Sequence, residues 1–309
     1  MKIAIMGSGG VGGLFGARLA ASGADVRFIA RGRHLAAIKQ DGLIVESEHC
    51  GDLKLAVEAT DDPGQVGHCD YVLFCVKLWD TEAACQAIAP MVGKMTTIIS
   101  FQNGIERDQI LQDAFGADKV AGGISYVAAT IKQPGVITQK GHVQKLVFGE
   151  YSGEQSSRLL RFADACRSAN IEVEMPADIR QALWYKFICL VAMSSMTAAT
   201  RLPIGPVRNN AKTRSLTRKV MEEVKAVGLK SGVSLESDIV DRQMAYLDGL
   251  AADVTASLEY DLRTGNKLEL PYLAGYVVEL GDRLGVDTPS LDTICALLDP
   301  YVDGRPVIA

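Results

Sequence analysis

The chain has 309 residues, a formal net charge of −5, and a globular composition in which 48% of residues are hydrophobic and 22% are charged. This length is sufficient for two domains that each bury a core. The negative charge argues against nonspecific nucleic-acid binding, which needs a basic surface to displace counterions, so we expect no nucleic-acid partner.

The first half of the chain alternates between predicted strands and predicted helices. Apolar runs predict strands at residues 2–6, 24–30, 71–76, 97–101 and 120–124, with two further turn-bounded strands near residue 135 and at 143–148. Helical spacing of apolar residues predicts helices at 11–22, 80–89 and 105–115. This alternation is typical of a mainly parallel, doubly wound sheet with right-handed crossovers.

The pattern changes after Glu150. A helix at 155–169 and a short strand at 171–174 are followed only by predicted helices, at 180–199, 211–231, 237–248, 253–263, 271–284 and 290–298. We therefore expect an α/β fold with an N-terminal Rossmann domain over residues 1–172, followed by an all-α C-terminal domain over 173–309.

A glycine-rich turn separates the first predicted strand from the first predicted helix. It consists of Gly7, Ser8, Gly9, Gly10, Val11 and Gly12, which match the dinucleotide-binding pattern G-x-G-x-x-G. The first glycine of this pattern permits a tight turn, the second lets a pyrophosphate approach the backbone, and the third lets helix and strand pack closely. The context favours a nucleotide site. The alternative is a glycine-rich turn that binds no ligand.

The end of the second predicted strand indicates which cofactor binds. An NAD-preferring protein usually has Asp or Glu there, for the ribose 2′-hydroxyl. In this chain the nearest acid, Asp25, stands at the start of the strand, whereas Arg31 and Arg33 follow its end. Guanidinium groups offer charge-assisted donors to a 2′-phosphate, so NADPH is the expected cofactor. The alternative is that both arginines are simply solvated.

Two polar residues follow later strands. Lys77 comes directly after the run at 71–76, and Asn103 follows the run at 97–101. Because ligands of open α/β sheets bind at the carboxyl ends of strands, we expect Lys77 to contact a bound anion and Asn103 to orient a carbonyl or a nicotinamide. Alternatively, Lys77 is a solvated lysine and Asn103-Gly104 only forms a turn.

Lys186 lies in a predicted helix that is apolar on nearly all sides. A lysine in such a place must either extend to the surface or be desolvated, and desolvation lowers the pKa of an ammonium group. A desolvated ammonium suits a general acid that protonates a carbonyl oxygen near neutral pH. Helical spacing puts Leu190 and Ser194 on the same face as Lys186.

Glu269 precedes a predicted helix that has Pro271 in its first turn, and Ser257 lies on the predicted helix before it. A carboxylate at that place also favours the helix dipole, which is the alternative to a catalytic role. The four histidines, at positions 34, 49, 68 and 142, have no ligand spacing. We therefore expect neither a metal site nor a hydrolase.

Taken together, these residues resemble the ketopantoate reductase (2-dehydropantoate 2-reductase) family over essentially the whole chain. The resemblance rests on the glycine-rich turn, Arg31, Cys75-Val76-Lys77, Phe101-Gln102-Asn103-Gly104-Ile105, Trp184-Tyr185-Lys186, and the pair Ser257 and Glu269. This combination is far more specific than any one motif.

The resemblance implies an activity and a role for each matched residue. In that family NADPH reduces 2-dehydropantoate to (R)-pantoate, on the route to pantothenate and coenzyme A, in a cleft between a Rossmann domain and a helical domain. By matched position, Lys186 is the catalytic acid and Glu269 its partner. The implied substrate-binding residues are Asn103, Ser257, Ser194 and Leu190. The implied cofactor-binding residues are Gly7, Ser8, Gly9, Gly10, Val11, Gly12, Arg31, Lys77, Asn103 and Glu269.

The chain departs from the family pattern near the substrate. The family commonly has asparagines one and two turns after the catalytic lysine, where this chain has Leu190 and Ser194. The usual Thr-Glu-Ile-Asp run is replaced by Leu268-Glu269-Leu270-Pro271. An apolar side chain that faces a polar substrate removes a hydrogen bond and changes specificity. A larger or less polar 2-oxo acid or ketone is therefore the alternative substrate.

Two other kinds of protein remain as alternatives. Rossmann folds also host non-enzymatic NADP(H)-sensing proteins. The presence of Lys186 and Glu269 argues against a sensor, which has no need for an acid near the cofactor. The other alternative is an NAD-dependent dehydrogenase that works in the oxidative direction.

Cysteine usage and hydropathy predict the compartment. Seven cysteines are scattered without a Cys-x-x-Cys pair, which is typical of reduced thiols in the cytosol. The chain starts directly with a structured motif, which leaves no room for a signal peptide. The longest apolar stretch, 187–199, is too short to span a bilayer. We expect a cytoplasmic protein without a membrane partner and, by analogy alone, a homodimer.

Overall fold

The computed structural model describes residues 1–306 and divides into two compact units. The first unit consists of Met1–Asn103 and Arg107–Ile179, and the second consists of Gly104–Glu106 and the chain from Arg180 onward. The division comes after Ile179, beyond the expected boundary at 172/173, because Ile179 packs on the strands of the first unit. A Cβ atom built on Gly122 would lie 2.7 Å from its Cγ1 atom. That the first domain binds the cofactor and the second carries the catalytic lysine stays a prediction.

A single ten-stranded sheet forms the centre of the first unit, counted over the described residues. The strands are β1 (Lys2–Met6), β2 (Asp25–Ile29), β3 (Leu43–Ser47), β4 (Leu53–Leu55), β5 (Glu58–Thr60), β6 (Tyr71–Phe74), β7 (Thr97–Ser100), β8 (Val120–Gln133), β9 (Val136–Gly149) and β10 (Glu172–Glu174). Their order is β4-β3-β9-β8-β7-β6-β1-β2-β5, and β10 pairs with β9. All neighbours are parallel except β8 with β9 and β3 with β4.

Helices cover both faces of this sheet. They are α1 (Gly10–Ala21), α2 (Gly32–Asp41), α3 (Thr81–Ile88), α4 (Arg107–Phe115) and α5 (Ser157–Ser168). Because side chains alternate along a strand, Ile3 and Ile5 join one buried cluster with residues of α1 and α5, whereas Ala4 and Met6 join another with residues of α3 and α4. The predicted doubly wound Rossmann domain is therefore confirmed.

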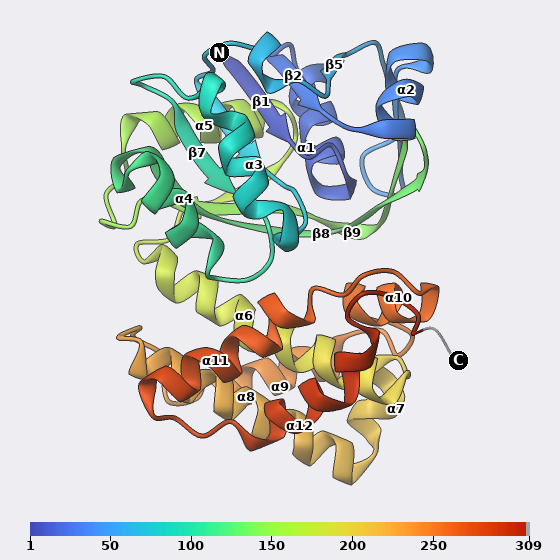
Figure 1. Ribbon diagram of the computed structural model, residues 1–309, viewed down its shortest axis with the longest axis vertical. Helices are drawn as coiled ribbons and strands as arrows, with labels where there is room; N and C mark the ends of the chain where they lie inside the picture. The colour runs from blue at the N-terminus through green and yellow to red at the C-terminus, as the bar shows by residue number, and fades with distance from the viewer. Residues whose placement is uncertain (307–309) are drawn as a thin grey trace. The chain divides into compact units, whose positions relative to one another are not determined.

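The hairpin of β8 and β9 is much longer than the sequence predicts. Each strand has 14 residues, where short strands at 120–124 and 143–148 were expected. Figure 1 shows the two strands running side by side. Register shifts at Val127/Ala128 and at Ile131/Gln133 break the alternation of apolar and polar side chains, which hides the outer half of the hairpin from a periodicity argument. Strands β3, β4 and β5 and helix α2 were not predicted either.

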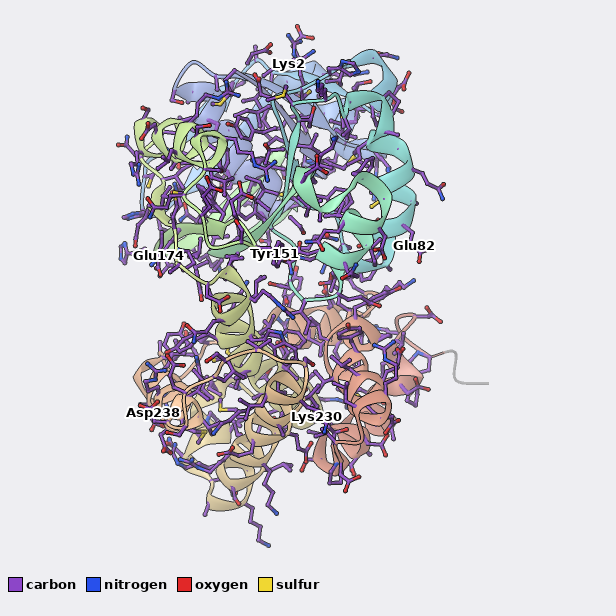
Figure 2. The ribbon with its side chains drawn as sticks, turned by 90° about the vertical axis from the view of Figure 1, so that its left-hand side faces the viewer. Lys2, Glu82, Tyr151, Glu174, Lys230 and Asp238 are labelled. Carbon is purple, nitrogen blue, oxygen red and sulfur yellow. The ribbon has the colours of Figure 1, made fainter. Side chains whose placement is uncertain are left out.

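The second unit contains helices and no strand over its described residues, as expected. They are α6 (Ile179–Thr200), α7 (Ile204–Asn209), α8 (Ala211–Lys230), α9 (Ile239–Gly249), α10 (Ser257–Thr264), α11 (Ala274–Leu284) and α12 (Pro289–Leu298). In Figure 2, the labelled Lys230 ends α8 and Asp238 directly precedes α9. The predicted helix at 271–284 begins late, since Leu273 (φ −109°, ψ −92°) separates a short 3₁₀ turn, Leu270–Tyr272, from α11.

Helix α6 is long and apolar enough to cross a membrane by length and composition alone. In this structure 67% of its most apolar 18-residue window is buried against other parts of the protein. Trp184 packs edge-on against Phe187, with ring centroids 5.8 Å apart. Burial of this extent is typical of the central helix of a helical domain.

Candidate cofactor and catalytic residues

Three of the predicted motifs meet at one edge of the sheet. Strands β1, β6 and β7 are neighbours and run parallel, so their carboxyl ends lie together. The glycine-rich turn follows β1, Lys77 follows β6, and Asn103 follows β7. The chain passes from β1 to β2 on one side and returns to β6 on the other. Ligands of doubly wound folds bind at such a switch point, and this is where the structure brings the three motifs together.

The glycine-rich turn has one glycine that the fold itself does not require. Gly7 has a φ of +96°, and a Cβ atom on it would lie 2.8 Å from the backbone nitrogen of Val76. Side chains on Gly10 and Gly12 would overlap the carbonyl oxygens of Ala129 and Gly7. At Gly9, by contrast, a Cβ atom would meet no atom within 4 Å. The space at Gly9 is open, as it must be if a pyrophosphate approaches the backbone there.

The same turn leaves backbone donors for an anion. Gly9 precedes α1, and no side chain caps this helix. The first amide groups of a helix lack partners within the helix and carry the positive end of its dipole. The residues of the turn therefore fit the pyrophosphate of a dinucleotide.

The end of β2 carries positive charge and no acid. Arg31 and Arg33 are exposed, and neither guanidinium has a hydrogen-bond or ion-pair partner among residues 1–306. Asp25 lies at the start of β2, where its carboxylate is paired with Arg27 at 2.8 Å. The second strand thus ends in two arginines that are available to a phosphate group.

Lys77 and Asn103 differ in their surroundings. Lys77 is exposed, and its Nζ atom lies 5.4 Å from the centre of the Trp79 ring. Asn103 is half-buried and precedes Gly104, whose φ of +82° makes the turn after β7. This turn requires glycine, because other residues rarely adopt such a φ.

A buried arginine binds the end of the strand that precedes Asn103, and sequence reasoning missed it. Arg107 is 1% exposed; its Nε atom donates to Ser100 Oγ at 2.9 Å, and its guanidinium also donates to the carbonyl oxygen of Gly123. Its neighbour Asp108 accepts a 2.6 Å hydrogen bond from the hydroxyl of Tyr151, which is labelled in Figure 2. Burial raises the pKa of Asp108, while Arg107 opposes this shift. The arginine therefore ties the end of β7 to β8.

Helix α6 of the second unit carries three of the predicted residues on one face. Lys186 and Leu190 are half-buried. Ser194 is 1% exposed, and its Oγ atom has no hydrogen-bond partner among the described residues. A buried hydroxyl without a partner costs about 1–3 kcal/mol. A well-packed helix rarely carries such a cost, so the unpaired hydroxyl is the feature that distinguishes Ser194 on this face of α6.

Glu269 and Ser257 complete the set in the second unit. Glu269 is 7% exposed and directly precedes the turn Leu270–Tyr272, whereas Ser257 is the first residue of α10 and is exposed. A second buried acid of this region, Glu259, was not predicted; its Oε1 atom accepts a 3.2 Å bond from Arg263. Glu259 stands in a helical pattern of ordinary polarity, so no sequence signal distinguishes it.

Two cysteines, Cys85 and Cys189, are buried. Burial raises the pKa of Cys85 to about 11 and that of Cys189 to about 12. A thiol with such a pKa is protonated near neutral pH and is a poor nucleophile.

Comparison with known families decides what kind of protein this is. Residues 3–153 match the family described as ketopantoate reductase PanE/ApbA, and residues 178–302 match its C-terminal domain. The chain belongs to the ketopantoate reductase family. The resemblance inferred from the motifs is therefore confirmed, and the protein is an oxidoreductase that acts on a CH–OH group with a nicotinamide cofactor. Membership of this family indicates that the reaction is the reduction of a 2-oxo acid.

Relatives of this ketopantoate reductase family member match it along almost their whole length. A 2-dehydropantoate 2-reductase of Mesorhizobium japonicum is 30% identical, with 96% of this chain and 97% of the relative covered. The crystal structure of a PanE/ApbA family ketopantoate reductase from Ralstonia eutropha is 33% identical, with a TM-score of 0.90 and 98% of each chain covered. A D-mandelate dehydrogenase, solved with NADH and anilino(oxo)acetate, shares the fold at 19% identity, with a TM-score of 0.89 and 98% of each chain covered.

Proposed function

We propose that the protein uses NADPH to reduce 2-dehydropantoate to (R)-pantoate, a step of pantothenate biosynthesis. Family membership supports the reaction type. The observation that carries the proposal is that the open Gly9, Lys77 and Asn103 share one sheet edge, in a chain that also has Lys186 on α6. A nucleotide site alone would also suit a sensor, whereas a lysine that acts as a general acid is needed only by a reductase.

The chemistry assigned to the chain is a proton transfer. When bound, NADPH supplies a hydride to the carbonyl carbon of the substrate. The Lys186 ammonium donates a proton to the carbonyl oxygen, so the C=O group becomes CH–OH, and water reprotonates the lysine. Glu269 orients Lys186, Asn103 positions the nicotinamide and the substrate, and Ser257 binds the substrate carboxylate.

The preference for NADPH over NADH follows from the end of β2. Arg31 binds the 2′-phosphate, and the absence of an acid at this strand end removes the usual partner of the ribose 2′-hydroxyl of NADH. The glycine-rich turn binds the pyrophosphate through its backbone.

A different 2-oxo acid is the second candidate substrate, and Leu190 favours it. Leu190 is half-buried one helical turn after Lys186, at a position where the family commonly has asparagine. A leucine there suits a substrate with a larger or less polar group beside its carbonyl.

A substrate panel separates these candidates. NADPH oxidation is followed with 2-dehydropantoate and with branched and aromatic 2-oxo acids, and each rate is repeated with NADH. The proposal expects the highest kcat/KM for 2-dehydropantoate with NADPH. A higher value for an apolar 2-oxo acid would replace the substrate, and tight NADPH binding without turnover of any carbonyl would favour a sensor.

The role of Lys186 has its own test. Lys186→Ala is expected to lower kcat by about 10²–10⁴, the usual contribution of a general acid, while the Kd for NADPH stays nearly constant. Lys219→Ala removes an exposed lysine of α8 and is the matched control. A wild-type rate in the Lys186 variant would remove this lysine from the mechanism.

The cytoplasm is the compartment that we propose, since the scattered cysteines lack disulfide partners among the described residues. The homodimer stays a prediction, to be checked by sedimentation.

A further inference from the structure

His34 uses both of its ring nitrogens to join two parts of the first unit. It lies in the first turn of α2, and its Nε2 atom is 2.8 Å from the carbonyl oxygen of Ser8 in the glycine-rich turn. Its Nδ1 atom is 3.0 Å from the backbone nitrogen of Gly135, in the turn that connects β8 to β9. The glycine-rich turn is thus tied to the hairpin through one side chain.

The two partners determine the protonation state of the ring. A backbone N–H can only donate, so Nδ1 must accept from Gly135 and therefore carries no proton. A carbonyl oxygen can only accept, so Nε2 must carry the proton that bonds to Ser8. His34 is neutral in this arrangement. Burial lowers its pKa, and this agrees with the geometry, although the hydrogen bond to Ser8 acts in the opposite direction.

Both ends of the bridge are well anchored. The Ser8 nitrogen and Oγ atom each donate to the carbonyl oxygen of Ile29, at 3.1 and 2.9 Å. On the hairpin side, the Gly135 carbonyl accepts from Ile44 at 2.9 Å. A Cβ atom on Gly135 would lie 3.0 Å from that of Ala37, which shows how closely α2 packs on this turn. His34 therefore bridges two backbone segments that have little freedom left.

The bond to Ser8 also controls the amide of Gly9. The peptide unit between them is planar and trans, so the Ser8 carbonyl and the Gly9 N–H point in opposite directions. Because His34 holds the Ser8 carbonyl, the Gly9 N–H points away from the His34 ring. The Gly9 N–H has no hydrogen-bond partner among residues 1–306, and the space beside Gly9 is open.

We propose that neutral His34 is a positioning residue that aims the Gly9 amide at the pyrophosphate of the cofactor, so that cofactor affinity falls when His34 becomes protonated. This inference rests on the proposed use of a nicotinamide dinucleotide. A protonated ring has a hydrogen on Nδ1 that faces the Gly135 N–H, and the bridge opens.

Few charged groups surround the ring. The glycine-rich turn has no titratable side chain. Near Gly135 the hairpin carries Lys132, whose Nζ atom is paired with Glu46 at 2.8 Å. The exposed Arg31 precedes α2, and the exposed Arg33 lies in its first turn. No carboxylate contributes to the pKa shift of His34. Below about pH 6.5 the His34 ring becomes protonated in the unfolded chain before it does so in the folded protein. The stability that the neutral ring contributes is therefore present above that pH and is lost as the pH falls through the lowered pKa of His34.

Two substitutions separate the ring nitrogens. In His34→Gln the side-chain amide nitrogen replaces Nε2 and keeps the bond to Ser8. In His34→Asn the amide oxygen replaces Nδ1 and keeps only the bond to Gly135. NADPH is titrated by fluorescence at pH 8. We expect the Kd to stay within about threefold for His34→Gln and to rise about five- to tenfold for His34→Asn, with kcat at saturating NADPH unchanged.

The pH dependence is measured with NADH, because the 2′-phosphate of NADPH itself titrates near pH 6. Between pH 8 and pH 5, the wild-type Kd for NADH should rise at least threefold, and that of His34→Gln should stay constant. His142→Asn, an exposed histidine of the same hairpin, is the matched control and should behave as wild type. A wild-type affinity that increases at low pH, as simple attraction between a cation and the pyrophosphate predicts, would overturn the proposal.

Nitrogen NMR of histidine-labelled protein gives a readout without the cofactor. The resonances of His34, assigned by their loss in His34→Gln, should show the Nε2–H tautomer at pH 8. An Nδ1–H tautomer would contradict the bridge. If the wild type fails to bind NADPH, both this inference and the proposed function fail; if it binds and His34→Asn binds equally well, the inference alone fails.

Discussion

Gly9 offers the sharpest test of where the cofactor binds. Its φ of −74° lies outside the left-handed region that favours glycine, and a Cβ atom there meets nothing within 4 Å. The free protein should therefore accept Gly9→Ala. A bound pyrophosphate should not accept it, because the added methyl group occupies the space that a phosphate oxygen needs to reach the backbone.

The expected magnitudes differ for folding and for binding. Replacing glycine restricts the unfolded chain, which stabilises the protein by about 0.4–1 kcal/mol. Alanine is a poorer N-cap than glycine, which costs about the same amount, so the free energy of unfolding should change by less than about 0.5 kcal/mol. Loss of one hydrogen bond to a charged oxygen costs about 1.5–3 kcal/mol, so the Kd for NADPH should rise about 10- to 150-fold.

The assay combines urea denaturation of the free protein with fluorescence titration of NADPH. Gly249→Ala is the matched control, since Gly249 ends α9 and its Cβ atom would also meet nothing within 4 Å. Gly12→Ala is the opposite case: its Cβ atom would overlap the carbonyl oxygen of Gly7, so the protein should lose about 1–3 kcal/mol of stability. A Gly9→Ala protein that binds NADPH as wild type does would refute the placement of the pyrophosphate.

Three further substitutions test other parts of the site. Arg31→Gln should lower kcat/KM for NADPH by about 10- to 150-fold and leave kcat/KM for NADH within about twofold. The control, Arg167→Gln, replaces an exposed arginine and should change neither value. Equal losses with both cofactors would exclude a role of Arg31 in binding the 2′-phosphate. Arg107→Met breaks a buried, hydrogen-bonded charge and should cost about 3–5 kcal/mol in urea denaturation; a change below 1 kcal/mol would mean that the arginine does not support its turn. Leu190→Asn restores the polar residue common in the family and should raise kcat/KM for 2-dehydropantoate relative to an aromatic 2-oxo acid, and an unchanged ratio would remove Leu190 from substrate selection.

The placement of much of the candidate site was predictable because its signals are local in the sequence. The glycine-rich turn, Lys77 and Asn103 each follow an apolar strand within a few residues, and parallel strands bring their carboxyl ends to one edge. The long helix α6 was predicted to within one residue at each end, since its apolar composition is continuous. The doubly wound fold followed from the alternation of strands and helices alone.

The parts that were missed depend on interactions between distant segments. The outer half of the β8–β9 hairpin has irregular register and exposed side chains, so no regular alternation indicates it. Helix α2 and its His34 gave no motif, because a histidine without ligand spacing carries no signal of its own. Arg107 looks like a polar residue at the start of a helix, although it is almost completely buried.

Sequence periodicity and glycine spacing by themselves determined the central parallel strands, most of the long helices and the position of the glycine-rich turn, because these depend on steric and apolar preferences of neighbouring residues. Only the tertiary structure decided which side chains support that turn. The backbone groups that still lack hydrogen-bond partners are known only when the sheet is complete. One of them, the Gly135 N–H, is then bound by His34, 101 positions away, and the carbonyl oxygen of Gly123 is bound by Arg107.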